Sequence, residues 1–164
     1  MSYRAPLDDI GIALKYGAAL GPAIEQGLFG DLSLDDVEAV LAEAGRFAGE
    51  VIAPLNRIGD TFGAKFADGA VTTAPGWKEA YRDWRLAGWN AVTAPAQWGG
   101  QALPQIVNAA CTEMWHAASV GFANGPMLTM AAIDALNAHG SDTLKRTYLE
   151  KLVSGEWMGT MQLT

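Results

Sequence analysis

The sequence predicts an all-α protein: an up-and-down helical bundle with a short extended strand at its C-terminal end. Three observations predict this class. Apolar residues recur at spacings of three and four along several segments, which is the period of a helix with one buried face. Gly and Pro residues mark the breaks between these segments. Half of the 164 residues are hydrophobic, so the chain can bury a core of single-domain size.

A charge-poor stretch occupies the middle of the chain. Arg85 is followed by no Lys or Arg until Lys145, and only Glu113, Asp134 and Asp142 carry a formal charge between them. Because so few charges cannot keep a large surface hydrated, we expect most of this stretch to be buried. The more charged flanking segments are expected to pack around it as amphipathic helices.

Residues 1–32 are expected to form an N-terminal extension, with a helix over about residues 7–20 and then a Gly-rich loop. Asp8 and Asp9 fall in the first turn of this helix, where the helix dipole favours negative charge. A Gly-Pro pair at 21–22 is expected to end the helix.

The clearest predicted helix begins at Ser33. Ser is a good N-cap, and Asp36 follows three positions later, an Asp variant of the capping box. An apolar stripe then continues to about residue 56, and Pro54 is expected to kink or end the helix. The next residues, 61–74, are expected to form a connector attached to the core by three apolar side chains: Phe62, Phe66 and Val71.

A further helix is expected from Pro75 to about Ala87, closed by Gly88. Its aromatic residues recur at spacings of four and three: Trp77, Tyr81 and Trp84. We interpret them as an aromatic core stripe, with an aromatic cofactor site as the alternative. We also expect five side chains to be largely buried: Trp77, Trp84, Val107, Met114 and Leu136.

The second half of the chain predicts three more helices after an irregular segment at 89–101. The first runs from Pro104 to about Ala118, and a turn follows at 121–125. The other two follow Pro126 and Ser141, and end before Gly140 and Gly155. Alternating apolar residues at 157–164 predict the extended strand.

Few residues offer chemistry of their own. Cys111, His116 and His139 lie singly in predicted helices, and no cluster with metal-ligand spacing surrounds them. The net charge of −7 argues against nucleic acid as a partner. We find no basic segment followed by an apolar run that would predict a signal peptide, and no membrane-spanning stretch, so a cytoplasmic location is expected.

The order of several short motifs is more informative than any one motif. The chain contains Pro-x-x-Trp-Gly-Gly at 95–100, Leu-Pro at 103–104, Gly-Ser-Asp-Thr-Leu-Lys at 140–145, Tyr-Leu-x-Lys-Leu-x-x-Gly-Glu at 148–156 and Met-Gln-Leu-Thr at 161–164. Over about residues 33–164 it resembles the N-terminal helical domain of the acyl-CoA dehydrogenase family. The early part of the chain, which includes Ala-Pro-Leu-Asn at 53–56, is most similar to sequences of the branch that includes methylmercaptopropionyl-CoA dehydrogenases.

The resemblance implies a helical domain at 33–156 and the first strand of a β-domain at 157–164. It implies FAD as cofactor, because the matching residues of the family line the flavin: Met161, Gln162, Leu163 and Thr164. It also implies α,β-desaturation of an acyl-CoA in fatty acid metabolism, with hydride transferred to FAD. The implied partners are the acyl-CoA substrate, an electron-transfer acceptor and further copies of the enzyme in a homo-oligomer.

The family continues past such a Leu-Thr pair into a β-domain and a second helical domain that carries the catalytic glutamate. Since the chain stops at Thr164, the resemblance implies a truncated, inactive chain without a catalytic residue, for which binding of FAD is not expected. We expect such a fragment to self-associate through its last strand or through an exposed apolar face of the helices at 104–139. The alternative hypothesis is a non-enzymatic helical module that binds a protein partner.

Overall fold

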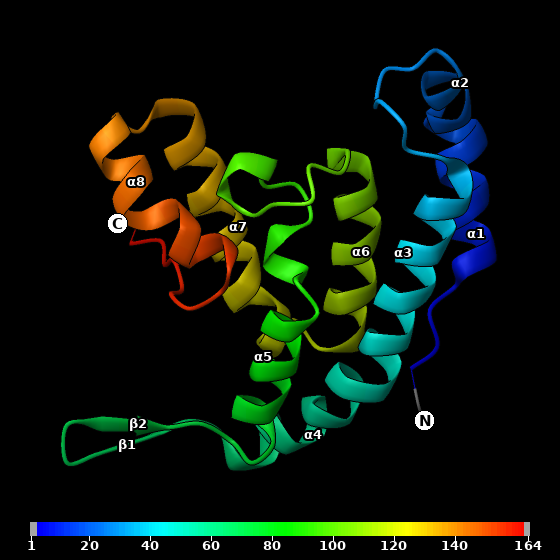
Figure 1. The fold of residues 1–164 in the computed structure, drawn as a ribbon. Helices are drawn as coiled ribbons and strands as arrows, with labels where there is room; N and C mark the ends of the chain where they lie inside the picture. Colours follow the sequence, from blue (N-terminus) through cyan, green and yellow to red (C-terminus); the bar gives the residue numbers. More distant parts are fainter. Residues whose placement is uncertain (1–2, 163–164) are drawn as a thin grey trace.

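The computed structural model describes residues 3–162, and it confirms the all-α class (Figure 1). The main helices form a row in which neighbours pack together: α1 (Leu7–Ile12), α3 (Leu34–Phe47), α6, α7 and α8. Helix α5 contributes aromatic residues to this row, and a small two-stranded hairpin projects from its lower end. The α-helices that follow the hairpin are Trp77–Leu86 (α5), Gln105–Ala118 (α6), Val120–His139 (α7) and Asp142–Val153 (α8).

Trp84 of α5 lies at the centre of the core and is fully buried. Its ring centroid is 4.5 Å from that of Trp115 on α6 and 5.9 Å from those of Phe47 on α3 and Phe122 on α7. Trp89, in the 3-10 turn after α5, lies 5.2 Å from Trp115. Edge-to-face contacts of this kind stabilise beyond the burial of apolar area. Of the aromatic stripe on α5, Trp84 is therefore core, as predicted, whereas Trp77 and Tyr81 are half-buried and pack against it.

Asn90 connects this core to the C-terminal helix. Its buried Oδ1 accepts a hydrogen bond from Nε1 of Trp84 at 2.7 Å, and its Nδ2 donates to the Leu152 carbonyl at 3.5 Å. The Tyr81 hydroxyl donates to the Gly155 carbonyl at 3.0 Å. Gly155 has a φ of +70°, which favours glycine, and there the chain turns back after α8.

The first helix is shorter than predicted. Helix α1 (Leu7–Ile12) passes into a π-helical turn (Ala13–Gly17), and α2 covers Leu20–Glu25. The predicted stop at the Gly-Pro pair is wrong, because Pro22 lies in the first turn of α2, where its missing N–H has no helical partner to lose. The break comes instead at Ala19, whose φ is +54°.

The α-helix that begins at Leu34 ends before Pro54, in line with the prediction, but the chain remains helical beyond the proline. Helix α3 (Leu34–Phe47) passes into a π-helical turn (Ala48–Ile52), and α4 follows as Ala53–Phe62. The wider hydrogen-bond ring of the π turn lets a new helix start with Pro54 in its first turn. In the first turn of a helix the backbone N–H groups have no acceptor within the helix, so the N–H that proline lacks is not missed. Buried side chains on both sides of the proline hold this arrangement against the core.

A β-hairpin replaces the predicted connector at 61–74. Strand β1 (Lys65–Ala67) pairs antiparallel with β2 (Ala70–Thr72). An Asp-Gly pair at 68–69, with φ of +52° and +76°, makes the tight turn that such a hairpin requires. Asp-Gly between two short runs is a sequence signal for a hairpin, so this element was open to prediction.

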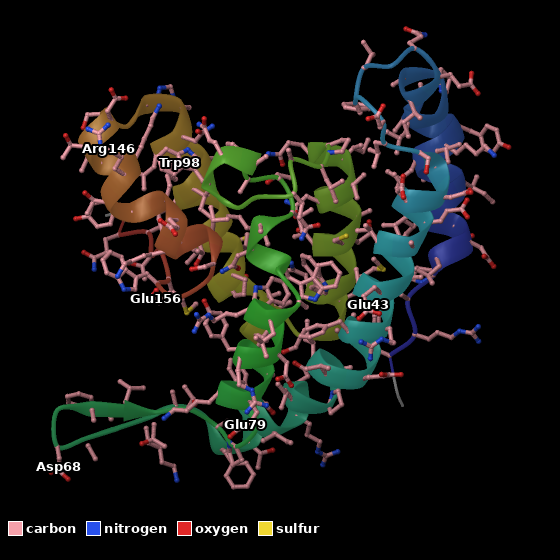
Figure 2. The ribbon with its side chains drawn as sticks, in the orientation of Figure 1. Glu43, Asp68, Glu79, Trp98, Arg146 and Glu156 are labelled. Carbon is pink, nitrogen blue, oxygen red and sulfur yellow. The ribbon has the colours of Figure 1, made fainter. Side chains whose placement is uncertain are left out.

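The three apolar residues expected to attach this segment to the core are exposed. Phe62 exposes 54% of its surface, Phe66 74% and Val71 61%. The prediction is wrong because Phe66 and Val71 lie on two three-residue strands that no further sheet or helix covers, while Phe62 is the last residue of α4. Asp68 marks the tip of the hairpin, which projects away from the helices (Figure 2).

A continuous helix, α7, replaces the turn predicted at 121–125. Phe122, Ala123 and Pro126 are all buried on its inner side. Because the proline removes one hydrogen bond whereas this face packs against the aromatic core, packing outweighs the helix-breaking tendency. Of the five side chains predicted to be largely buried, three are: Trp84, Val107 and Met114; Trp77 and Leu136 are half-buried.

Both predicted Ser caps are confirmed. Ser33 Oγ accepts from the Asp36 amide at 3.1 Å, and the Ser33 amide donates to Asp36 Oδ2 at 2.9 Å, which completes the capping box. Ser141 Oγ accepts from the Leu144 amide at 3.4 Å at the start of α8. Each cap satisfies a backbone amide that the first helical turn leaves without a partner.

The first prediction concerns Trp84. We expect Trp84→Ala to lower the free energy of unfolding by about 3–5 kcal/mol, because it opens a cavity between four elements and removes the donor to Asn90. Urea unfolding followed by circular dichroism measures this. Leu86→Ala is the control on the same helix: Leu86 is 80% exposed, so a change within about 0.5 kcal/mol is expected. Equal losses in both variants would contradict the assignment of Trp84.

The second prediction concerns pH. Hydrogen bonds from the Ser33 side chain and backbone hold the pKa of Asp36 below its ordinary value of 3.8. A lowered pKa stabilises the fold above the ordinary value, and this contribution is lost as the pH falls through the lowered one. We therefore expect Ser33→Ala to cost about 1 kcal/mol near pH 7, and the difference from wild type to shrink below pH 3.8.

The matched control for this pH effect is Ser141→Ala, because the cap of α8 contains Leu144 where the capping box has Asp36. Its loss of stability should not shrink over the same acidic range. Unfolding midpoints measured at several pH values test both variants. A Ser33→Ala effect independent of pH would contradict the capping-box assignment.

Candidate functional site

The charge-poor middle of the chain forms part of the core and also one exposed face. The expectation that most of residues 86–144 are buried is wrong: residues 89–94 and the inner sides of α6 and α7 are largely buried, but more residues of this stretch are exposed than buried. The outer sides of α6 and α7 are exposed, however, and Glu113 and Asp134 are the only Asp, Glu, Lys or Arg residues within 105–139. The low charge thus has two causes, and an exposed surface with little charge is a candidate for contact with another molecule.

A groove of about 380 Å³ runs between α6 and α7 on this face. At one end the Gln105 Nε2 donates to Asp134 Oδ2 at 3.4 Å, which connects the two helices. The remaining lining is apolar or small and polar: Asn108, Ala109, Thr112, Met127, Met130 and Ala131. Methionine side chains adapt to irregular apolar ligands, so this lining suits a flexible chain that bears a few hydrogen-bonding groups.

Asn108 brings an unpaired polar atom to the groove. Its Oδ1 is buried and has no hydrogen-bond partner among the described residues. Next to it on the lining, Met130 is buried and supplies an apolar wall. Since buried amide oxygens in folded proteins are nearly always hydrogen-bonded, this oxygen is an acceptor that the described residues leave unsatisfied beside the groove.

A larger hollow of about 620 Å³ lies between α1 and α3. Its lining includes Asp8, Lys15 and Glu38, so it mixes both signs of charge with apolar side chains. We place the candidate site in the groove between α6 and α7 instead. That lining is nearly uncharged and includes the unpaired amide oxygen of Asn108.

The residues with chemistry of their own do not form an active site. Burial raises the pKa of the Cys111 thiol to about 12, so Cys111 is a core residue and not a nucleophile. The His116 Nδ1 lies 2.9 Å from the Thr112 carbonyl of its own helix. Within residues 3–162, no three His, Cys, Asp or Glu side chains gather as a metal site would require.

The segment after α8 returns along the helices. The Trp157 amide donates to the Lys151 carbonyl at 3.0 Å, and the Trp157 ring lies 4.4 Å from Lys151 Nζ. The Gly159 amide donates to Thr129 Oγ1 of α7 at 3.1 Å. The strand predicted from residue 157 onward is not formed in the described part of this segment, because its backbone bonds to α7 and α8 and has no partner strand.

The structure describes two of the four residues assigned to the flavin. Met161 and Gln162 are exposed, and their backbones make no hydrogen bond to the rest of the described chain. Leu163 and Thr164 lie outside the described residues. Neither Met161 nor Gln162 lines the groove between α6 and α7.

Sequence reasoning missed Asn108, which lines the groove, and Thr129, which lies outside it and bonds to the Gly159 amide. Thr129 is fully buried on the same helix as Met130 and Ile133, in a mainly apolar setting. A threonine hydroxyl among apolar residues of a helix needs a hydrogen-bond partner. A Thr in an apolar helical stretch is therefore the sequence signal that could have pointed to Thr129. Asn108 gave no such signal, because a single Asn in a helix is most often at the surface.

None of the helices in the described range combines the length and apolar character that a membrane crossing needs. Comparison with known proteins gives the family. Residues 35–156 match the model described as acyl-CoA dehydrogenase, N-terminal domain. The chain is 45% identical over its whole length to 3-methylmercaptopropionyl-CoA dehydrogenase of Ruegeria pomeroyi, and covers 28% of that protein.

The chain is also 30% identical over 99% of its length to a butyryl-CoA dehydrogenase of Syntrophomonas wolfei, of which it covers 27%. A second butyryl-CoA dehydrogenase of this organism is 31% identical over 79% of the chain. The chain therefore spans less than a third of the length of these relatives. It belongs to the acyl-CoA dehydrogenase family of oxidoreductases, and it matches that family's N-terminal domain.

Proposed function

We propose that this chain is the N-terminal domain of a longer, FAD-dependent acyl-CoA dehydrogenase that introduces an α,β double bond into an acyl-CoA thioester. The observation that carries this proposal is the family match over residues 35–156. It is supported by 45% identity, along the entire chain, to a relative of which the chain covers 28%. In this proposal residues 1–32 are an extension, 33–156 the helical domain, and 157–164 the start of the next domain.

The exposed face of α6 and α7 is proposed as the surface that meets the rest of the enzyme. Its groove would provide one wall for the acyl chain, with Met127, Met130 and Ala131 as the apolar lining. At about 25 cal/mol per Å² of buried apolar area, such a wall can supply a useful share of the binding free energy. Low charge on this face supports the proposal, since few charges would lose water on contact.

Met161, Gln162, Leu163 and Thr164 are proposed to contact the flavin. The described residues fit such a role, because the backbone of Thr160, Met161 and Gln162 leaves its N–H and C=O groups free of hydrogen bonds within residues 3–162. These groups match the hydrogen-bonding edge of a flat heterocycle. FAD, when bound, supplies the hydride acceptor, and the chain's own part is to orient and shield it.

The catalytic base is proposed to come from the rest of the enzyme. Removing a proton from the α-carbon of a thioester needs a carboxylate held away from water, with a raised pKa. Among the described residues no Asp or Glu is buried. The pKa values of Asp36 and Glu43 are held below their ordinary values by hydrogen bonds from Ser33 and from Arg46.

The proposed partners of the complete enzyme are its acyl-CoA substrate, an electron-transfer acceptor that reoxidises FAD, and further copies in a homo-oligomer. A cytoplasmic role in fatty acid metabolism completes the proposal. Its support is the family to which the chain belongs. The names of the relatives set the substrates to compare first: 3-methylmercaptopropionyl-CoA and butyryl-CoA.

The test of this proposal, and the third prediction, compares the complete enzyme with the 164-residue chain. We expect the complete protein, purified with FAD, to reduce an artificial electron acceptor when either acyl-CoA is added. The chain alone, with added FAD, should give no turnover above buffer, because its described carboxylates lie at the surface. Turnover by the chain alone would refute the assignment of the base; a complete protein without FAD or turnover would favour a non-enzymatic interaction module.

The fourth prediction tests the groove in the complete enzyme. Ala131→Trp should raise the KM for butyryl-CoA by about tenfold or more while the protein still binds FAD, because the indole fills the apolar wall. Ala138→Trp, on the same helix but outside the groove, is the control and should keep the wild-type KM. Steady-state kinetics measure both, and equal KM values for the two variants would remove the groove from the acyl site.

A further inference from the structure

Thr129 makes two hydrogen bonds from one buried hydroxyl. Its Oγ1 donates to the Gly125 carbonyl one turn earlier on α7, at 3.2 Å. The same oxygen accepts from the Gly159 amide at 3.1 Å, across 30 positions of sequence. The first bond is common for Thr in helices, but the second joins α7 to the segment that leads toward Met161.

Glycines on both sides allow this close approach. A Cβ at Gly159 would lie 2.7 Å from the Ala132 Cβ and 3.3 Å from the Thr129 Cα, so a larger residue could not bring its backbone to this point of α7. A Cβ at Gly125 would lie 2.8 Å from the Met158 terminal methyl, a flexible group that can move aside, so the tighter constraint is at Gly159. The segment therefore fits a seat shaped for it, formed by Gly125, Thr129 and Ala132.

The seat is the last fixed point before the proposed flavin residues. Upstream, the Trp157 amide bonds to the Lys151 carbonyl, and Glu156 lies beside the end of α8 (Figure 2). Beyond Gly159, the described backbone makes no further hydrogen bond. Since Met161 is two residues further on, its Cα stays within about 7 Å of that of Gly159. A fixed Gly159 thus limits where Met161 and Gln162 can lie.

We propose that Thr129 is a positioning residue: its hydroxyl holds Gly159, and thereby sets the course of Met161 and Gln162 toward the flavin. This inference rests on the proposed function, because it takes these two residues to contact FAD. Thr129 itself is buried beneath the segment and touches neither flavin nor substrate in this assignment. It acts through the backbone of Gly159.

The test compares three variants in the complete, FAD-loaded enzyme. Thr129→Val keeps the shape of the side chain but removes both hydrogen bonds, whereas Thr129→Ser keeps the hydroxyl. Thr147→Val is the matched control, because Thr147 Oγ1 also donates to a carbonyl one turn earlier, at 2.8 Å, but it is exposed and accepts no bond from another segment.

Amide hydrogen exchange is the first readout. In Thr129→Val, we expect the Gly159 amide to exchange about tenfold faster than in wild type, because it has lost its acceptor. The second readout is the FAD dissociation constant with the visible spectrum of the bound flavin: binding should weaken by about tenfold and the spectrum should shift. Thr129→Ser should restore both values, and Thr147→Val should change neither.

Several outcomes would overturn the inference. Unchanged exchange at Gly159 in Thr129→Val would show that the hydroxyl does not hold the segment. Faster exchange with unchanged FAD affinity and spectrum would show that the segment does not orient the flavin. If the wild-type enzyme itself bound no FAD, the proposed function would fail, and the inference with it. Should Thr129→Val not fold, Gly159→Ala perturbs the same contact from the segment side and is read out in the same way.

Discussion

The fold depends on how Trp84 is surrounded. One fully buried indole contacts aromatic rings from α3, α6 and α7, and its N–H is bonded to Asn90, which in turn reaches the carbonyl end of α8. A buried indole N–H is more stable with a partner, and for Trp84 that partner is the side chain of Asn90. The helices that meet there are held mainly by apolar contact, and this buried hydrogen bond adds to it. The scarcity of charge between Arg85 and Lys145 follows, because a lysine or arginine on these inner faces would have no partner.

The sequence was sufficient where the signal was local. The Ser33 capping box, the Ser141 cap and the bounds of α6 and α8 follow from neighbouring residues, and the structure confirms them. The sequence was insufficient at Pro22 and Pro126, because a local breaking tendency competes there with burial of residues distant in sequence. The hairpin is a different case. Its Asp-Gly turn is a recognisable sequence signal, whereas Phe66, predicted to pack on the core, is exposed.

The candidate site was predictable only in part. Ordered motifs gave the family, which is now established, and the expectation of an exposed face on the helices at 104–139 agrees with the structure. The groove between α6 and α7 could not be predicted, because it depends on which side of each helix faces the core. Thr129 could not be paired with Gly159 for the same reason: a bond across 30 positions leaves no periodic trace in the sequence. The role of Met161–Thr164 remains a prediction drawn from the family.

The hairpin has a consequence for how the chain behaves at high concentration. Both of its edges carry free backbone groups, and the exposed Phe66 and Val71 lie opposite each other in its register. Such an edge is a template for adding strands from other molecules, the first step toward cross-β aggregates. Its strands are only three residues long, however, and Lys65 and Asp68 place charges at their ends. An added strand could form only a few backbone hydrogen bonds with so short an edge, and charged side chains lie at its ends. The short length of the hairpin therefore disfavours fibre growth.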